Sequence, residues 1–257
     1  MGGTVTYAAI AAQRLGMCTR MLTSGVARDL VIDELLSIEV VCRPSERTTT
    51  FENRYRAGHR QQRILAIAEP LTLDGLPPAW AHSDVVHLGP VVHEVAPDMV
   101  NAFPHALVGI TPQGWLRAWD GAGIVTPRNW PDARQTLAAA DVVVMSEEDV
   151  GERHLLRDYV RWTRLLILTV GKRGAIVYHE GREVRVPAYA VREVDPTGAG
   201  DVFAATFLVR LHETGDAIEA ARYANCAASF VVERSGTAGI PTREAVEQRL
   251  ARGHLMG

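Results

Sequence analysis

Short runs of hydrophobic residues recur along the chain, separated by segments whose apolar positions repeat at helical spacing. Runs of four or five apolar residues bounded by turn-forming residues are typical of buried parallel strands. Because such runs alternate here with helical segments, the pattern predicts an α/β fold with a central, mostly parallel sheet and helices on both faces. The predicted strands of this sheet span residues 84–88, 106–110, 141–145 and 165–169.

The region between residues 39 and 68 follows a different period. Apolar and polar residues alternate there in three stretches, around residues 38–42, 48–53 and 64–68, and Gly58 and His59 fall at a turn. A period of two indicates strands with one exposed face. We therefore expect a single domain over residues 1–257, to which residues 39–68 contribute a small β-unit.

The two ends of the chain are predominantly helical in pattern. Small residues predict a helix over residues 6–15, ended by Gly16 and followed by a strand over residues 18–23. Three further helices are predicted after Gly198, over residues 217–232 and from Pro241 onward. Trp115 and Trp119 stand four residues apart, as expected for core residues on one helix face.

Composition narrows the class of protein. The hydrophobic content of 47% supports a substantial core, and the net charge of -3 gives no reason to expect nucleic acid as a partner. No apolar run approaches the roughly 20 residues that a membrane-spanning helix needs. The three cysteines are widely spaced and odd in number, which indicates reduced thiols and a cytoplasmic location.

The stretch from Val194 to Phe203 carries the strongest chemical signal. Gly198 and Gly200 permit a tight loop, and the helix formers that follow place the loop's bare N–H groups at a helix N-terminus, where an anion is favoured. Asp201 then stands either as an ordinary acidic residue of a first helical turn or as a general base beside an anion hole for a transferring phosphoryl group.

The order Asp-x-Thr-Gly-Ala-Gly-Asp over residues 195–201, followed by an apolar helix, resembles the C-terminal signature of ribokinase-like (PfkB-type) carbohydrate kinases. The resemblance implies an ATP-dependent kinase in which Asp201 is the general base and Gly198, Ala199 and Gly200 form the anion hole. It further implies a monovalent cation, K⁺, at Asp195 and Thr197.

Two other segments resemble parts of the same family. Thr169-x-Gly171-x-x-Gly174 is similar to the nucleotide loop, with Lys172 or Arg173 near the phosphates of ATP. Asn225 resembles a residue that lines the adenine pocket. The acidic segment Ser146-Glu147-Glu148-Asp149 is similar to the motif that organises Mg²⁺, which implies Glu148 and Asp149; an ordinary helix N-cap is the alternative interpretation.

The resemblance also assigns an acceptor site. Gly2 and Gly3, with Thr6 in the helix that follows, are expected to let a small sugar or polyol approach the backbone. Residues 39–68 resemble the β-lid that closes over the sugar, with Asn53 as a candidate substrate contact and the lid as a candidate homodimer surface. A solvated hairpin is the alternative for these side chains.

The chain departs from the family pattern in three places. Family members carry a strand before the glycine pair, and we expect that first strand to be missing here. Tyr7 stands where many sugar kinases have an Asn, and Thr111-Pro112-Gln113-Gly114-Trp115 replaces Asp-x-Asn-x-Arg. These changes weaken assignment to a typical hexose kinase. They leave a cyclic polyol such as inositol or a nucleoside as acceptors, and a catalytically silent binding protein as a further alternative.

Two other enzyme classes fit poorly. Gly198-Ala199-Gly200 begins a dinucleotide-binding pattern, but Phe203 occupies its third small position and Asp201 would repel a pyrophosphate. His82, His87 and His93 are spaced five and six residues apart, which does not place them on one helix face for a hydrolytic metal.

Overall fold

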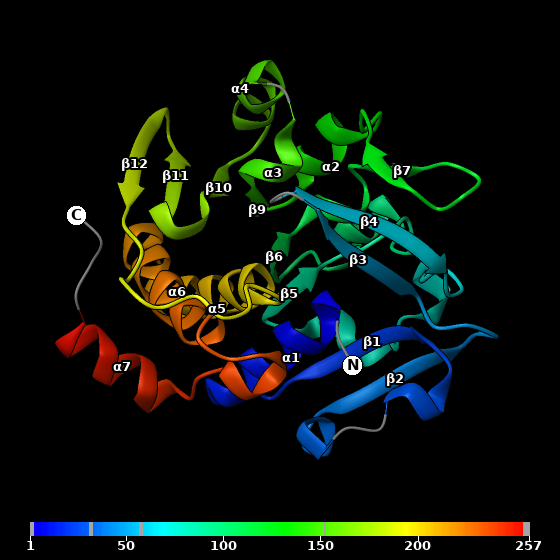
Figure 1. The fold of residues 1–257 in the computed structure, drawn as a ribbon, viewed down its shortest axis with the longest axis horizontal. Helices are drawn as coiled ribbons and strands as arrows, with labels where there is room; N and C mark the ends of the chain where they lie inside the picture. Colours follow the sequence, from blue (N-terminus) through cyan, green and yellow to red (C-terminus); the bar gives the residue numbers. More distant parts are fainter. Residues whose placement is uncertain (1–2, 31–32, 57–58, 152, 254–257) are drawn as a thin grey trace.

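The computed structural model describes residues 3–30, 33–56, 59–151 and 153–253 (Figure 1). Its strands are β1 (Arg20–Gly25), β2 (Glu39–Pro44), β3 (Thr50–Arg56), β4 (His59–Ala66), β5 (Val85–Leu88), β6 (Leu107–Ile110), β7 (Arg117–Trp119), β8 (Val125–Pro127), β9 (Val142–Ser146), β10 (Leu165–Thr169), β11 (Ala175–His179) and β12 (Arg182–Val186). Its α-helices are α1 (Thr4–Arg14), α2 (Ala133–Ala139), α3 (Glu147–Val150), α4 (Arg153–Trp162), α5 (Ala199–Thr214), α6 (Ala217–Val231) and α7 (Arg243–Arg252).

Six strands form the central sheet in the order β12-β11-β10-β9-β6-β5. Strands β5, β6, β9 and β10 are parallel, and β11 and β12 add an antiparallel hairpin at one edge. The four parallel strands coincide closely with the four hydrophobic runs, so the predicted α/β fold is confirmed.

The core explains why these runs are hydrophobic throughout. Side chains alternate between the two faces of a strand, so in β9 Val142 and Val144 pack in one hydrophobic cluster while Val143 and Met145 pack in another. The first cluster includes residues of α5 and α6, and the second includes residues of α2 and α4. Helices therefore cover both faces of the sheet, as Figure 1 shows.

Three smaller two-stranded sheets surround this body. Strands β3 and β4 form an antiparallel hairpin, as do β7 and β8, whereas β1 and β2 form a parallel pair. The three stretches with period two do form β2, β3 and β4, but β2 pairs with β1 and not with β3. Within the described residues no strand precedes α1, and β1 and β5 do not pair with each other.

Other boundaries differ modestly from those expected. Helix α1 begins at Thr4 instead of Thr6, and β1 begins at Arg20 instead of residue 18. The pair Trp115 and Trp119 does not share a helix, because Trp119 ends strand β7. In the described part of the chain, no helix has both the length and the apolar character that crossing a membrane requires.

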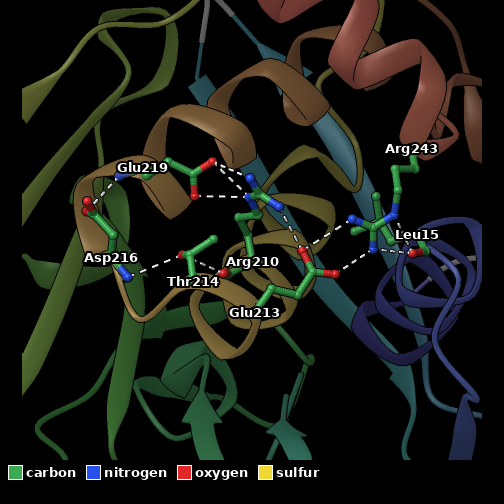
Figure 2. A network of polar contacts seen from close by, with 7 residues as sticks. All are labelled: Leu15, Arg210, Glu213, Thr214, Asp216, Glu219 and Arg243. Carbon is green, nitrogen blue, oxygen red and sulfur yellow. Dashed lines mark hydrogen bonds and ion pairs between the residues drawn. The ribbon is translucent and has the colours of Figure 1, made fainter.

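A polar network ties together the C-terminal ends of two central helices (Figure 2). Arg243, at the start of α7, donates a hydrogen bond to the carbonyl of Leu15 at the end of α1 (2.9 Å) and forms an ion pair with Glu213 near the end of α5 (2.6 Å). Arg210 also contacts Glu213 (3.0 Å) and holds Glu219 of α6 (2.7 Å). The network fixes α1 and α5 relative to each other at the ends opposite their N-termini.

Candidate active site

Helix α5 begins at the glycine-rich loop, as the sequence predicts. Gly198 is its N-cap residue and adopts a left-handed conformation with φ 82°. A Cβ atom at this position would lie 2.2 Å from the ring of Tyr7 in α1. Only glycine meets both demands, so the close packing of Tyr7 against the loop fixes the start of α5.

Asp201 lies in the first turn of α5, and part of its surface faces a large cavity. Burial raises the pKa of this carboxyl to about 6, and the negative charge of Asp149 acts in the same direction. A hydrogen bond with Thr4 and the positive charge of Arg117 oppose the rise. Asp201 is therefore largely ionised at neutral pH, and its pKa lies close to neutral. Both properties suit a general base.

The cavity has a volume of about 1950 Å³ and contains most of the predicted site. It is larger than a typical ligand pocket. Residues of both β1 and β5 line it, so the cavity extends between these two strands. It joins Asp201 to the turn at residues 169–174. The predicted site residues that line it are Gly3, Thr6, Asn53, Glu148, Thr169, Gly171, Gly174, Thr197, Gly198, Ala199, Gly200, Asp201 and Asn225.

Two predicted residues are placed differently, and a third is not described. Asp149 and Asp195 are not among the residues that line the cavity, and Gly2 lies outside the described residues. The carboxylate of Asp149 accepts hydrogen bonds from the backbone N–H of Ser146 and from the side chain of Gln113, both at 3.2 Å. Asp195 accepts the N–H of Thr197 (3.0 Å) and so shapes the loop before Gly198.

The Thr169–Gly174 turn follows the central strand β10. Gly171 and Gly174 both have positive φ angles, 58° and 94°. A Cβ atom on Gly174 would lie 2.1 Å from the carbonyl oxygen of Val186, so this glycine permits the turn to pack against the end of β12. The side chain of Asn225 in α6 donates to the carbonyls of Val186 and Pro187 (3.0 and 3.2 Å). Asn225 thus fixes the wall of the cavity next to the turn.

Arg117 is a functional candidate that sequence reasoning missed. It is only 8% exposed, lines the cavity, and lies over the ring of Phe51 in the β3–β4 hairpin (5.3 Å). Its guanidinium donates to the carbonyl of Val91 (2.7 Å) and to the side chain of Gln62 in β4 (2.9 Å). Arg117 therefore connects the hairpin to the part of the cavity that holds Asp201, and its only sequence signal is a charged residue between two tryptophans.

Two further side chains near the cavity have shifted pKa values. Burial lowers the pKa of His87 to about 4, so its ring is neutral when it hydrogen-bonds to Thr111 (3.0 Å). Burial also raises the pKa of Tyr7, and the charges of Asp195 and Asp201 add to that rise. Tyr7 therefore stays protonated at neutral pH beside the carboxylates.

Comparison with known proteins agrees with this geometry. Residues 117–243 match the family described as pfkB family carbohydrate kinase. A pyrophosphate-dependent kinase in the ribokinase family superposes with a TM-score of 0.80 at 23% identity, covering 96% of this chain and 91% of its own. The chain has the ribokinase-like fold. Ribokinase from Thermotoga maritima has the same fold, with a TM-score of 0.78 at 22% identity over 98% of this chain and 88% of its own.

The names of the sequence relatives indicate different acceptors. Ribokinase of Bacillus subtilis is 45% identical over 87 residues, which is 34% of this chain and 30% of that protein. Fructokinase of Escherichia coli is 29% identical over 193 residues, 66% of this chain and 62% of its own. The chain thus spans less than two thirds of the length of these curated relatives.

Proposed function

We propose that this chain is an ATP-dependent kinase that phosphorylates a hydroxyl group of a small sugar or polyol. The observation that carries the proposal is the single cavity that joins the Asp201 carboxylate at the start of α5 to the turn at residues 169–174. The match of residues 117–243 to the pfkB family of carbohydrate kinases supports a phosphotransferase with an alcohol acceptor. The same site suits a nucleoside acceptor, which a 35% identical stretch of 95 residues in a nucleoside kinase of Methanocaldococcus jannaschii supports.

In this mechanism Asp201 accepts the proton of the acceptor hydroxyl as that oxygen bonds to the transferred phosphorus. The bond from phosphorus to the donor's bridging oxygen breaks in the same step, and the leaving group keeps the electron pair. The backbone N–H groups at Gly198, Ala199 and Gly200 stabilise the negative charge on the phosphoryl oxygens. Thr4 holds the Asp201 carboxylate in place through its hydrogen bond.

A divalent cation fits one part of the site. The described residues contain no cluster of three or more His, Cys, Asp or Glu side chains suited to a metal. Mg²⁺ commonly binds through one or two carboxylates together with substrate phosphates, so Glu148, which lines the cavity, suffices as the protein ligand. When bound, Mg²⁺ would neutralise charge on the donor phosphates. Asp149 would act indirectly, because it caps α3 and holds Gln113.

The residues expected to hold K⁺ fit less well. One carboxylate oxygen of Asp195 already accepts the N–H of Thr197. In the loop after α6, the side-chain hydroxyl of Thr237 donates a hydrogen bond to Glu34 (2.9 Å). The backbone carbonyl of Thr237 accepts a hydrogen bond from Arg14 (3.4 Å). We therefore assign no step of the reaction to a monovalent cation.

An acceptor panel tests the proposal. The purified chain is incubated with Mg²⁺, ATP and a set of sugars, inositols and nucleosides, and the products are followed by ADP release and ³¹P NMR. We expect turnover with at least one acceptor and a loss of about 10²- to 10⁴-fold in kcat for Asp201→Asn. Asp132→Asn is the control, because Asp132 is exposed at the start of α2 and makes no side-chain cap bond.

Two outcomes would contradict the proposal. Full activity in Asp201→Asn would show that this carboxylate is not the base. Absence of turnover with every acceptor would instead favour a catalytically silent binding protein.

A further inference from the structure

The proposed mechanism leaves the imidazole of His87 without a role. His87 lies in β5 and lines the cavity. Side chains alternate along a strand, and Val86 and Leu88 pack in the cluster that includes residues of α2 and α4. The side chain of His87 therefore points to the opposite face of the sheet, against which α5 packs (Figure 1). The helix that carries Asp201 thus covers the face that carries His87.

The packing of α5 sets the span between His87 and Asp201. In the parallel register of β5 and β6, His87 lies opposite Gly109, and a Cβ atom on Gly109 would overlap the side chain of Leu208 in α5. Leu208 follows Asp201 by seven residues, which is about 10 Å along the helix. A hydrogen bond of about 2.8 Å at each end leaves about 5 Å between the two bound atoms. The span therefore suits two hydroxyl groups on non-adjacent carbons of one small molecule.

A line of polar groups joins the two ends of this span. Asp201 is hydrogen-bonded to Thr4, and Nε2 of His87 is hydrogen-bonded to Oγ1 of Thr111 (3.0 Å). Gly89 lies between the two threonines, because a Cβ atom there would overlap the side chain of Thr4 and lie 3.1 Å from Oγ1 of Thr111. The absence of a side chain at Gly89 lets both threonines hold the carboxylate and the imidazole in fixed positions.

The imidazole of His87 keeps one nitrogen for a ligand. Among the described residues its only hydrogen bond is the one from Nε2 to Thr111, and Nδ1 is not among the fully enclosed atoms that lack a partner. Nδ1 therefore has accessible surface, and this surface opens on the cavity that the residue lines. Because Thr111 can accept from or donate to Nε2, Nδ1 can act as an acceptor or as a donor. A hydroxyl group is a suitable partner in either case.

The surroundings keep this ring neutral. Burial lowers the pKa of His87 to about 4. Thr111 stands where the ribokinase-like pattern has an Asp, whose negative charge would favour the imidazolium form. Around the cavity, seven described carboxylates face only three arginine and lysine side chains. A neutral acceptor therefore fits this cavity better than an acceptor that already carries a phosphate group.

We propose that His87 determines acceptor specificity: its Nδ1 forms a hydrogen bond with a second hydroxyl of a neutral polyhydroxy acceptor whose reacting hydroxyl lies at Asp201. This inference rests on the proposed kinase function and adds the residue that selects the acceptor. Thr111 acts as a positioning residue, because it holds Nε2 and so orients the ring. Phosphorylated sugars should be rejected, since a neutral imidazole offers no charge to pair with a phosphate.

Histidine NMR tests this contact without turnover. The nine histidine rings are labelled with ¹⁵N, and the signals of His87 and His105 are identified by their absence in His87→Gln and His105→Gln. The full chain is titrated, without a donor, with D-ribose, D-fructose, myo-inositol and adenosine, and separately with ribose 5-phosphate and fructose 6-phosphate. We expect at least one neutral compound to shift the His87 signals in a saturable manner. The two phosphates should not shift them, and the signals of exposed His105 should stay in place throughout.

Steady-state kinetics provide the second test. His87→Ala should raise the KM for the neutral acceptor by about 5- to 50-fold, the range expected for one lost hydrogen bond at a buried polar group, and leave the KM for the donor within about twofold. His87→Gln keeps a neutral donor and acceptor and should recover part of this affinity. His105→Gln is the matched control and should change neither constant.

Monodeoxy analogues of the acceptor separate a contact from a structural role. In the parent chain, the analogue that lacks the hydroxyl bound by His87 should have a KM raised by a similar factor of about 5- to 50-fold. In His87→Ala that analogue and the complete acceptor should have the same KM, because the two changes remove one interaction. A merely structural role would raise both values and preserve the ratio between them.

The possible outcomes separate the two proposals. If an acceptor is phosphorylated but leaves the His87 signals in place, or if every analogue keeps its ratio in His87→Ala, the assignment of His87 is wrong and the kinase proposal stands. A preference for a phosphorylated acceptor would also overturn the assignment. If a compound shifts the His87 signals but none is phosphorylated, the contact holds and the kinase proposal fails. If no compound binds or is phosphorylated, both fail.

Discussion

The contact between Gly198 and Tyr7 leads to a quantitative prediction for Gly198→Ala. The residue has φ 82°, and an alanine in the left-handed region costs about 1–2 kcal/mol. The added Cβ would lie 2.2 Å from two ring atoms of Tyr7, far inside an ordinary contact, and overpacking of a core typically costs about 1–3 kcal/mol. We therefore expect the free energy of unfolding to fall by roughly 2–5 kcal/mol.

The steric and conformational parts can be separated by a double-mutant cycle. Tyr7→Ala removes the ring atoms that the new Cβ would meet but leaves the backbone conformation of residue 198 unchanged. In that background Gly198→Ala should cost only about 1–2 kcal/mol, which corresponds to a coupling energy of about 1–3 kcal/mol. Urea unfolding of the four proteins, with similar m-values, measures each free energy.

Gly200→Ala serves as the matched control. Gly200 lies in α5 without a positive φ angle, and a Cβ there would meet no atom within 4 Å. The substitution should leave stability unchanged or raise it by up to about 1 kcal/mol through helix propensity. Equal losses for Gly198→Ala in the presence and absence of the Tyr7 ring would refute the proposed packing constraint.

Three further results are expected. Because burial raises the pKa of Asp201 to about 6, kcat/KM should fall as the pH drops below about 6 and the base becomes protonated, and a pH profile that is flat between 5 and 7 would contradict this. The same raised pKa means that the folded state binds more protons than the unfolded state between pH about 4 and about 6. The stability that this group contributes is therefore present below pH about 4 and is lost as the pH rises through about 6. Asp201→Asn should flatten that part of a curve of unfolding free energy against pH. Asn225→Ala removes the amide that donates hydrogen bonds to the carbonyls of Val186 and Pro187, and should reduce the free energy of unfolding by about 1–3 kcal/mol. It should also weaken the affinity for the phosphoryl donor. An unchanged urea midpoint would exclude the anchoring role.

The sequence predicts the central fold well because parallel strands bury both faces. Runs such as Val142–Met145 are apolar at every position because both faces of the strand pack in hydrophobic clusters, and their short length between turn-forming residues favours a strand. Strand pairing is harder to predict from the sequence. The alternation around Val40 identifies a strand but not its neighbour, so the parallel pairing of β2 with β1 follows only from the tertiary arrangement.

The candidate site divides in the same way. Gly198 to Asp201 were predictable because loop, glycines and helix start are contiguous in the sequence. Arg117 was not, because its role depends on Phe51 and Gln62, which come from the distant β3–β4 hairpin. Asp149 illustrates an ambiguity of short acidic segments, in which the same residue is suited to bind a metal or to cap a helix, and the structure shows the cap.

The network that joins α1, α5 and α7 makes the site sensitive to changes made far from it. Helix α1 has 11 residues and is therefore about 16 Å long, with Leu15 held by Arg243 at one end and Thr4 beside Asp201 at the other. If the contact at Leu15 loosens and α1 tilts by about 4°, its two ends are displaced relative to each other by about 1 Å, and Thr4 shifts relative to Asp201. A displacement of that size is enough to slow a well-aligned reaction by about 100-fold. Precision at the loop before α5 is thus maintained partly from the opposite side of the molecule.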